Sequence, residues 1–248
     1  PYGISETYIE SEVDFLKDHF ERVIILPIEL DPGEPIMRAL PEGIEYYNVS
    51  QKKQSVARTG DIVGGLRNIF APTDYYKWDK EEIGSDFRKR MFFEYFCNRS
   101  VRSYRECLKV LKNCGIDGYD SITVYSYWFF VTCRIGALIK KWLLSNGINA
   151  RLVSRAHRYD LYESANSLNF LPYRNTLAAE CDKIYVCSNQ GAEHLKEVIP
   201  KYKDKIVTAY LGTMDHGVSS SSSTFHIVTC SRISNVKRLD KLIDSLAS

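Results

Sequence analysis

The sequence predicts an α/β fold in which a parallel sheet carries helices on both faces. Two observations support this prediction. Between residues 6 and 216, short runs of β-branched and other apolar residues alternate with stretches of helical periodicity. Strands that alternate with helices pair in parallel, because each helix returns the chain over the sheet. The second observation is size, since 248 residues with 44% hydrophobic composition can bury a large core.

Six strands and six helices are predicted in this part of the chain. The strands are residues 23–27, 44–49, 122–126, 150–154, 184–187 and 206–208. The helices are residues 6–20, 55–70, 80–112, 129–145, 173–181 and 190–198. The carboxyl ends of parallel strands share one edge of a sheet, so we expect the ligand of this Rossmann-like fold to bind there.

The organisation of the chain changes after residue 216. We predict one domain over residues 1–216, a serine-rich linker over 217–224, and the start of a second Rossmann-like domain over 225–248. In the last range, a strand over 225–230 leads into an amphipathic helix. One strand and one helix cannot bury their apolar faces alone, so we expect that domain to be truncated. Residues 1–3 are typical of a turn that follows a strand, so we also expect the first domain to lack its first strand.

Charge, cysteines and missing motifs narrow the class of protein. The formal net charge of +2 does not favour a nucleic-acid partner. Cys133, Cys187 and Cys230 lie in apolar runs without C-x-x-C spacing, which predicts core thiols in a cytoplasmic, reducing compartment. No phosphate-loop or G-x-G-x-x-G signature supports an ATPase or a dinucleotide oxidoreductase. No Asp-x-Asp pair occurs, so we predict neither a metal nor a cofactor.

Residues 85–112 form the most basic stretch of the chain. They hold eight lysines or arginines against three acidic residues, and aromatic residues lie between the charges. One interpretation is a basic amphipathic helix that contacts an anionic membrane at its inner face. The alternative, which we favour, is a long surface helix whose aromatic stripe lies in the core.

Polar residues follow three of the predicted strands, at positions 126–128, 155–160 and 188–190. Among these residues, His157 is the strongest candidate for a catalytic or binding role, because an imidazole just past a buried strand can exchange a hydrogen bond with a substrate hydroxyl. Asp160, three residues later, can hold one tautomer of that ring. The alternative is a histidine with only a structural role.

Two cations follow the last predicted strand. Arg232 comes two residues after Cys230, and Lys237 follows five residues later. Fixed cations at a strand end favour an anionic ligand, most simply a phosphate or diphosphate. The alternative is a pair of solvated charges at the start of a surface helix.

A set of short motifs, in order along the whole chain, resembles the family-4 glycosyltransferases of the GT-B fold. The motifs are Pro1-Tyr2-Gly3, Glu6-Thr7-Tyr8-Ile9 with Glu12, Arg155-x-His157-x-x-Asp160-Leu161-Tyr162, Ser188, Leu211-Gly212, and Ser231-Arg232-x4-Lys237-Arg238. The resemblance implies an enzyme that transfers a sugar from a nucleotide-diphosphate sugar to an acceptor hydroxyl with retention and without a metal. It also implies two Rossmann-like domains, of which the first binds a sugar or lipid-linked sugar acceptor. By analogy with the family, the setting would be cell-surface polysaccharide synthesis.

The resemblance also implies roles for single residues. Arg232 and Lys237 match the R-x4-K motif that contacts the donor diphosphate, and His157 matches the cleft histidine. Candidates for the acceptor side or the cleft loop are Tyr2, Gly3, Glu6, Tyr127, Arg155 and Asp160. The family's E-x7-E motif, which holds the donor sugar and ribose, is expected beyond residue 248, so we expect these residues alone to be inactive.

Two rival hypotheses remain. A nucleotide-sugar epimerase shares the two-domain architecture but uses a different set of acids and histidines in its cleft. A non-catalytic protein could use the fold as a binding partner in a polysaccharide assembly complex. Loss of activity in a full-length protein that carries His157→Ala and Arg232→Ala would count against the second rival, whereas unchanged activity would remove the catalytic assignment.

Overall fold

The computed structural model describes residues 9–37, 41–70, 76–212, 215, 217, 224–231, 233 and 235–247. The chain divides into two compact units, residues 1–213 and residues 214–248. Each unit is described by itself below. Tyr2, Gly3, Glu6 and Arg232 lie outside the described residues.

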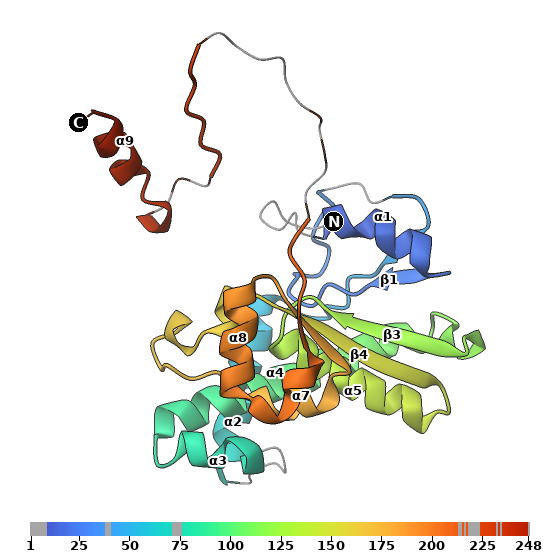
Figure 1. The fold of residues 1–248 in the computed structure, drawn as a ribbon. Coiled ribbons are helices and arrows are strands. Elements are labelled where there is room, and N and C mark those ends of the chain that lie inside the picture. Colours follow the sequence, from blue (N-terminus) through green and yellow to red (C-terminus); the bar gives the residue numbers. More distant parts are fainter. Residues whose placement is uncertain are drawn as a thin grey trace. The chain divides into compact units, whose positions relative to one another are not determined.

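The first unit contains two parallel sheets. Four strands, β3 (Ser121–Ser126), β4 (Asn149–Ala156), β5 (Lys183–Val186) and β6 (Ile206–Thr208), pair in this order in the larger sheet (Figure 1). The smaller sheet pairs β1 (Val23–Ile25) with β2 (Ile44–Tyr46). The α/β class, the parallel pairing and the six strands predicted before residue 216 are therefore confirmed.

Helices connect the strands and flank the larger sheet. They are α1 (Glu10–His19), α2 (Gln54–Phe70), α3 (Tyr76–Ile83), α4 (Phe87–Leu111), α5 (Val131–Ser145), α6 (Arg158–Leu161), α7 (Arg174–Glu180) and α8 (Asn189–Val198). Short 3-10 turns cover Ile116–Gly118, Glu163–Ala165 and Pro200–Lys205. The arrangement is that of a Rossmann-like fold.

The single helix predicted over residues 80–112 is in fact two helices. Gly84 ends α3 with a backbone φ of +54°, a left-handed conformation that glycine adopts at little cost. Asp86 then begins α4, because its carboxylate accepts the backbone N–H groups of Arg88 and Lys89. The prediction was wrong at this point because a local stop and start signal interrupts a continuous helical periodicity.

The core lies between the larger sheet and its helices. Alternate residues of β4 and β5, among them Leu152 and Ile184, are fully buried against α5, α7 and α8. Phe93 of α4 is fully buried as well, and Phe96 packs against Phe130 at a ring-centroid distance of 4.7 Å. The aromatic residues of α4 thus contribute to the core, as the favoured interpretation of residues 85–112 expected.

The second unit contains a 3-10 turn, η4 (Asn235–Lys237), and one helix, α9 (Leu239–Ala247), which confirms the predicted helix. The strand predicted over residues 225–230 is wrong, because these residues have no regular secondary structure. Phe225 and Val228 are 88% and 85% exposed. A strand must share its N–H and C=O groups with a neighbour, and none of the described residues pairs with this segment.

The expectation of core thiols holds for one of the three cysteines named above. Cys133 is buried in α5, Cys187 is half-buried, and Cys230 is exposed. Cys230 belongs to the segment that forms no strand, so no packed layer covers it. Among the described helices, none combines the length and the apolar character that crossing a bilayer requires.

Candidate functional site

The candidate site lies where the strands of the larger sheet end. Register pairs Ser126 of β3 with Ser154 of β4, and Ala156 of β4 with Val186 of β5. Because all four strands are parallel, the residues that follow them meet at one edge of the sheet. The segments after β3 and β4 supply the side chains described next.

His157 is the first residue after β4 and is 8% exposed. Its ring lies against two aromatic rings from the segment after β3, at centroid distances of 5.2 Å from Tyr127 and 4.5 Å from Trp128. Ser126 Oγ donates to the carbonyl oxygen of Trp128 at 2.7 Å and so fixes the turn that carries both rings. The imidazole therefore packs against two neighbouring aromatic rings at the sheet edge.

Asp160 joins the two segments. Its carboxylate accepts the backbone N–H of His157 at 2.5 Å, which closes a capping box at the start of α6. It also accepts the backbone N–H of Phe129 at 2.6 Å, from the segment that leads into α5. Two buried donors from two different strand ends thus share one carboxylate. This arrangement holds the segment after β3 against the residue that carries the imidazole.

The protonation states at this edge follow from burial. Burial lowers the pKa of His157 to about 4, and the nearby charge of Arg155 acts in the same direction. Burial raises the pKa of Asp160 to about 7, although the backbone N–H groups of His157 and Phe129 oppose this change. At neutral pH the imidazole is consequently uncharged, with one nitrogen able to donate and the other able to accept.

Arg155 organises a second group of polar side chains beside His157. Its Nη2 lies 2.6 Å from Glu12 Oε1, its Nε donates to Tyr125 Oη at 2.9 Å, and its Nη1 donates to the carbonyl oxygen of Ala209 at 2.9 Å. Tyr125 Oη in turn donates to Glu12 Oε2 at 2.8 Å. This network connects α1, β3, β4 and the segment after β6.

The charges of this network are stable near neutral pH. Burial acts to lower the pKa of Arg155, but the opposing effects of Tyr125 and Glu12 are larger together. The pKa of Arg155 is therefore raised, and the guanidinium stays charged. Burial raises the pKa of Tyr125, so its phenol remains protonated and continues to donate. The sheet edge therefore holds one fixed cation, one phenol, one neutral imidazole and two carboxyl groups, those of Glu12 and Asp160.

The structure brings four of the predicted site residues together, and these are Tyr127, Arg155, His157 and Asp160. Lys237 is exposed at the end of η4 in the second unit. The four candidates outside the described residues, Tyr2, Gly3, Glu6 and Arg232, stay predictions, and so do the chemical roles of all nine candidates.

Three residues of the site were not predicted as site residues. Tyr125 is two residues before Tyr127, so strand alternation could have indicated that both side chains lie on one face. Trp128 belongs to a polar stretch that the sequence did single out. Glu12 belongs to one of the short sequence motifs but was given no role there, and only tertiary packing joins it to Arg155.

Within the part of the chain that the structure describes, no group of three or more histidine, cysteine, aspartate or glutamate residues could hold a metal ion.

No protein-family model matches this chain, and no curated protein matches it either. The described edge holds an imidazole, a phenol and carboxyl groups, which are side chains of the kinds that hydrogen-bond to hydroxyl groups. Its aromatic rings can cover an apolar face of a ligand.

Proposed function

We propose that this protein is a retaining, metal-independent glycosyltransferase of the family-4 type, with its first unit on the acceptor side. The observation that carries the proposal is His157, a neutral imidazole packed against Tyr127 and Trp128 at the carboxyl edge of a parallel sheet. Sugar rings combine hydroxyl groups with apolar C–H faces. A neutral hydrogen-bonding group beside aromatic rings suits both features.

In this proposal His157 exchanges a hydrogen bond with an acceptor or donor hydroxyl at the sheet edge. Asp160 positions the imidazole through the start of α6. Arg155 keeps Glu12 and Tyr125 in place beside it, since it bonds both. Each group then acts from a fixed position and needs little reorganisation when a sugar binds.

The second unit would hold the donor. Arg232 and Lys237 would bind the diphosphate, where negative charge grows as the bond to the anomeric carbon breaks. Removing one preorganised donor of this kind costs about 3–4 kcal/mol of transition-state stabilisation. The proposed setting is cytoplasmic synthesis of a cell-surface polysaccharide, with a sugar or lipid-linked sugar as the acceptor.

The test is binding by the 248-residue chain, followed through tryptophan fluorescence and ligand-observed NMR. The ligands are a panel of mono- and disaccharides together with UDP-, GDP- and ADP-sugars. We expect at least one free sugar to bind, and His157→Ala to weaken it about 5- to 150-fold, the loss of one or two hydrogen bonds. The matched control is His19→Ala, because His19 is exposed on α1.

Two outcomes would overturn the proposal. If no sugar and no nucleotide sugar binds, the sheet edge is not a sugar site. If His157→Ala binds the same sugars as tightly as the wild type, the imidazole has no part in recognition. Binding of nucleotide sugars alone, without any free acceptor sugar, would instead favour the epimerase hypothesis.

A further inference from the structure

Helix α2 has an exposed apolar side. Val56, Ile62, Val63 and Leu66 are 58%, 48%, 62% and 43% exposed. Val56, Val63 and Leu66 are spaced by seven and three residues, so they lie on one side of the helix. A contiguous apolar surface of this kind on a folded protein commonly marks an interaction site.

The opposite side of α2 is tightly bound to α4, so the helix cannot rotate to bury its exposed residues. A Cβ on Gly65 would lie 3.1 Å from the backbone nitrogen of Tyr95, so the two helices approach closely at this point. Asp61 is buried, and Arg102 of α4 donates to its carboxylate at 2.9 Å. The outward direction of the apolar side is therefore a consequence of the packing.

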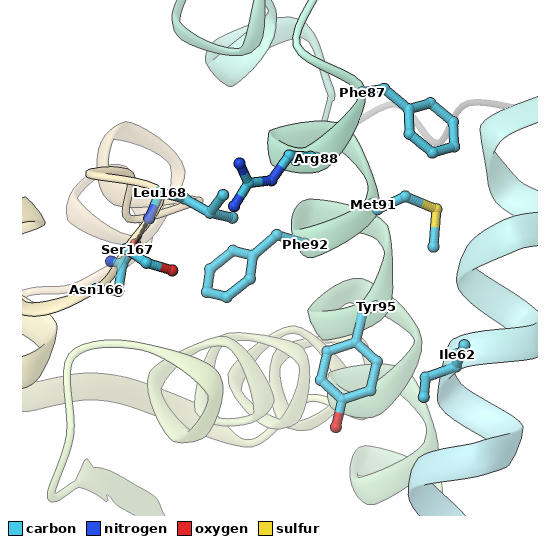
Figure 2. Close-up of a pocket in the computed structure, with 9 residues that line it drawn as sticks. All are labelled: Ile62, Phe87, Arg88, Met91, Phe92, Tyr95, Asn166, Ser167 and Leu168. Carbon is cyan, nitrogen blue, oxygen red and sulfur yellow. Dashed lines mark hydrogen bonds between the residues drawn. The ribbon is translucent and has the colours of Figure 1, made fainter.

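An apolar groove adjoins this side. It has a volume of about 450 Å³ and lies between α2, α4 and the segment of residues 166–168 (Figure 2). Its lining includes Ile62, Phe87, Met91, Phe92, Tyr95 and Leu168, with Arg88 alongside. Phe87 is 60% exposed, so an aromatic side chain at the first turn of α4 extends the apolar surface.

The charges around the apolar side are mostly positive. Lys52, Lys53, Arg58 and Arg67 are all exposed, and none of them pairs with a carboxylate among the described residues. The one acidic residue between positions 52 and 70 is Asp61, which is buried and bonded to Arg102. At the start of α4 the exposed Arg88 is accompanied by one exposed acid, Asp86. An exposed apolar side with this excess of cations complements an anionic, partly apolar surface.

We propose that the exposed side of α2, together with the first turn of α4 and the adjoining groove, docks on an anionic lipid bilayer. Apolar side chains would enter the interface while lysines and arginines meet the lipid phosphates. A second copy of the chain fits less well, because a twofold contact would bring the same cations against one another. The proposal does not depend on the sugar chemistry proposed above.

This proposal differs from the sequence-based interpretation of residues 85–112, because it uses α2 and only the start of α4. Farther along α4, Arg99 pairs with Glu29 and Arg102 pairs with Asp61, while Arg105 and Lys109 are exposed but the aromatic residues beside them are not. Phe93 is fully buried. Only the beginning of α4 keeps both an exposed aromatic ring and an exposed cation, Phe87 and Arg88.

Co-sedimentation of the 248-residue chain with vesicles tests this proposal. We expect binding to mixed phosphatidylglycerol–phosphatidylcholine vesicles, weaker binding at high salt, and none to phosphatidylcholine alone. Neutralising Lys52 and Lys53 to glutamine should weaken binding about 25-fold, since each cation near an anionic surface contributes about fivefold. Val63→Glu should weaken binding at least as much, because it replaces an apolar contact with a repelled charge.

The matched control is Leu144→Glu, which places the same charge at a leucine of α5 that is 48% exposed. This variant should bind vesicles like the wild type. Equal binding to neutral and anionic vesicles, or unchanged binding by Val63→Glu, would overturn the proposal. A third outcome would also overturn the proposal. If the wild-type chain formed a dimer that did not bind vesicles, and Val63→Glu converted this dimer to monomers, α2 would be a protein interface.

Discussion

The substitution Gly191→Ala tests how α8 is seated beside the candidate site. Gly191 lies in the first turn of α8, directly after β5. A Cβ there would lie 2.6 Å from Leu161 Cδ2, 2.9 Å from Val186 Cγ1 and 3.0 Å from Ser188 Oγ. Non-bonded carbon atoms prefer separations of about 3.5–4.0 Å, so the added methyl group must displace packed neighbours on three sides.

The magnitude follows from a comparison within the same protein. Gly60 lies on α2, and a Cβ there would have no atom within 4 Å. Both substitutions gain the same helix propensity, about 1 kcal/mol. Gly191→Ala alone carries the cost of overpacking, about 1–3 kcal/mol. We therefore expect Gly60→Ala to be the more stable variant by about 1–3 kcal/mol.

Urea unfolding followed by tryptophan fluorescence measures this difference directly, and thermal unfolding provides a second measurement. Each kcal/mol corresponds to about 2–4 °C for a domain of this size. The denaturant slope should be the same for both variants, because the surface exposed on unfolding does not change. If Gly191→Ala were as stable as Gly60→Ala, the close packing of α8 against α6 and β5 would be refuted.

Three further predictions concern the candidate site. Asp160→Ala leaves two buried N–H groups without an acceptor, so its free energy of unfolding at about pH 5 should fall by about 2–6 kcal/mol; a loss below about 1 kcal/mol by urea unfolding would contradict this. Burial raises the pKa of Asp160 from 3.8 to about 7, so the folded state binds this proton more tightly than the unfolded state does. The free energy of unfolding of the wild type should therefore fall, relative to that of Asp160→Asn, as the pH rises from about 4 to about 7. His157 acts in the opposite direction, because burial lowers its pKa from 6.5 to about 4 and its contribution is lost as the pH falls through that range. NMR should show the His157 ring neutral throughout the range above about pH 5, and a midpoint near 6.5 would contradict the structure.

The strands and most helices of the first unit were predictable because their signals are local. Buried strands such as β4 appear as short apolar runs, and amphipathic helices such as α5 repeat their apolar residues every three or four positions. The break between α3 and α4 was equally local. Gly84 and Asp86 are a stop and a start signal, and the prediction passed over them.

The candidate site was predictable in part for the same reason. Arg155, His157 and Asp160 follow one strand, so their sequence spacing already places them at its carboxyl end. Their contacts with the segment after β3 depend on which strand pairs with β4, and a pattern along one strand does not contain that information. The contact of Glu12 with Arg155 could not be predicted, because α1 is far from Arg155 in the sequence.

Two features were decided by tertiary structure alone. Residues 225–230 have the composition of a strand, yet they form none, because a strand is stable only when a neighbour accepts and donates its backbone hydrogen bonds. Helix α2 carries apolar residues on two sides, and only its packing against α4 decides which side faces water.

By itself, the sequence determined where helices and strands form in the first unit and which polar residues end a strand. These properties depend on residues a few positions apart, whose interactions can form locally before the rest of the fold is in place. Only the tertiary structure decided that Glu12 meets Arg155, that Asp160 ties the segment after β3 to His157, and that α2 leaves an apolar side exposed. Such contacts join residues far apart in the chain, and they form only when the whole core has chosen one packing.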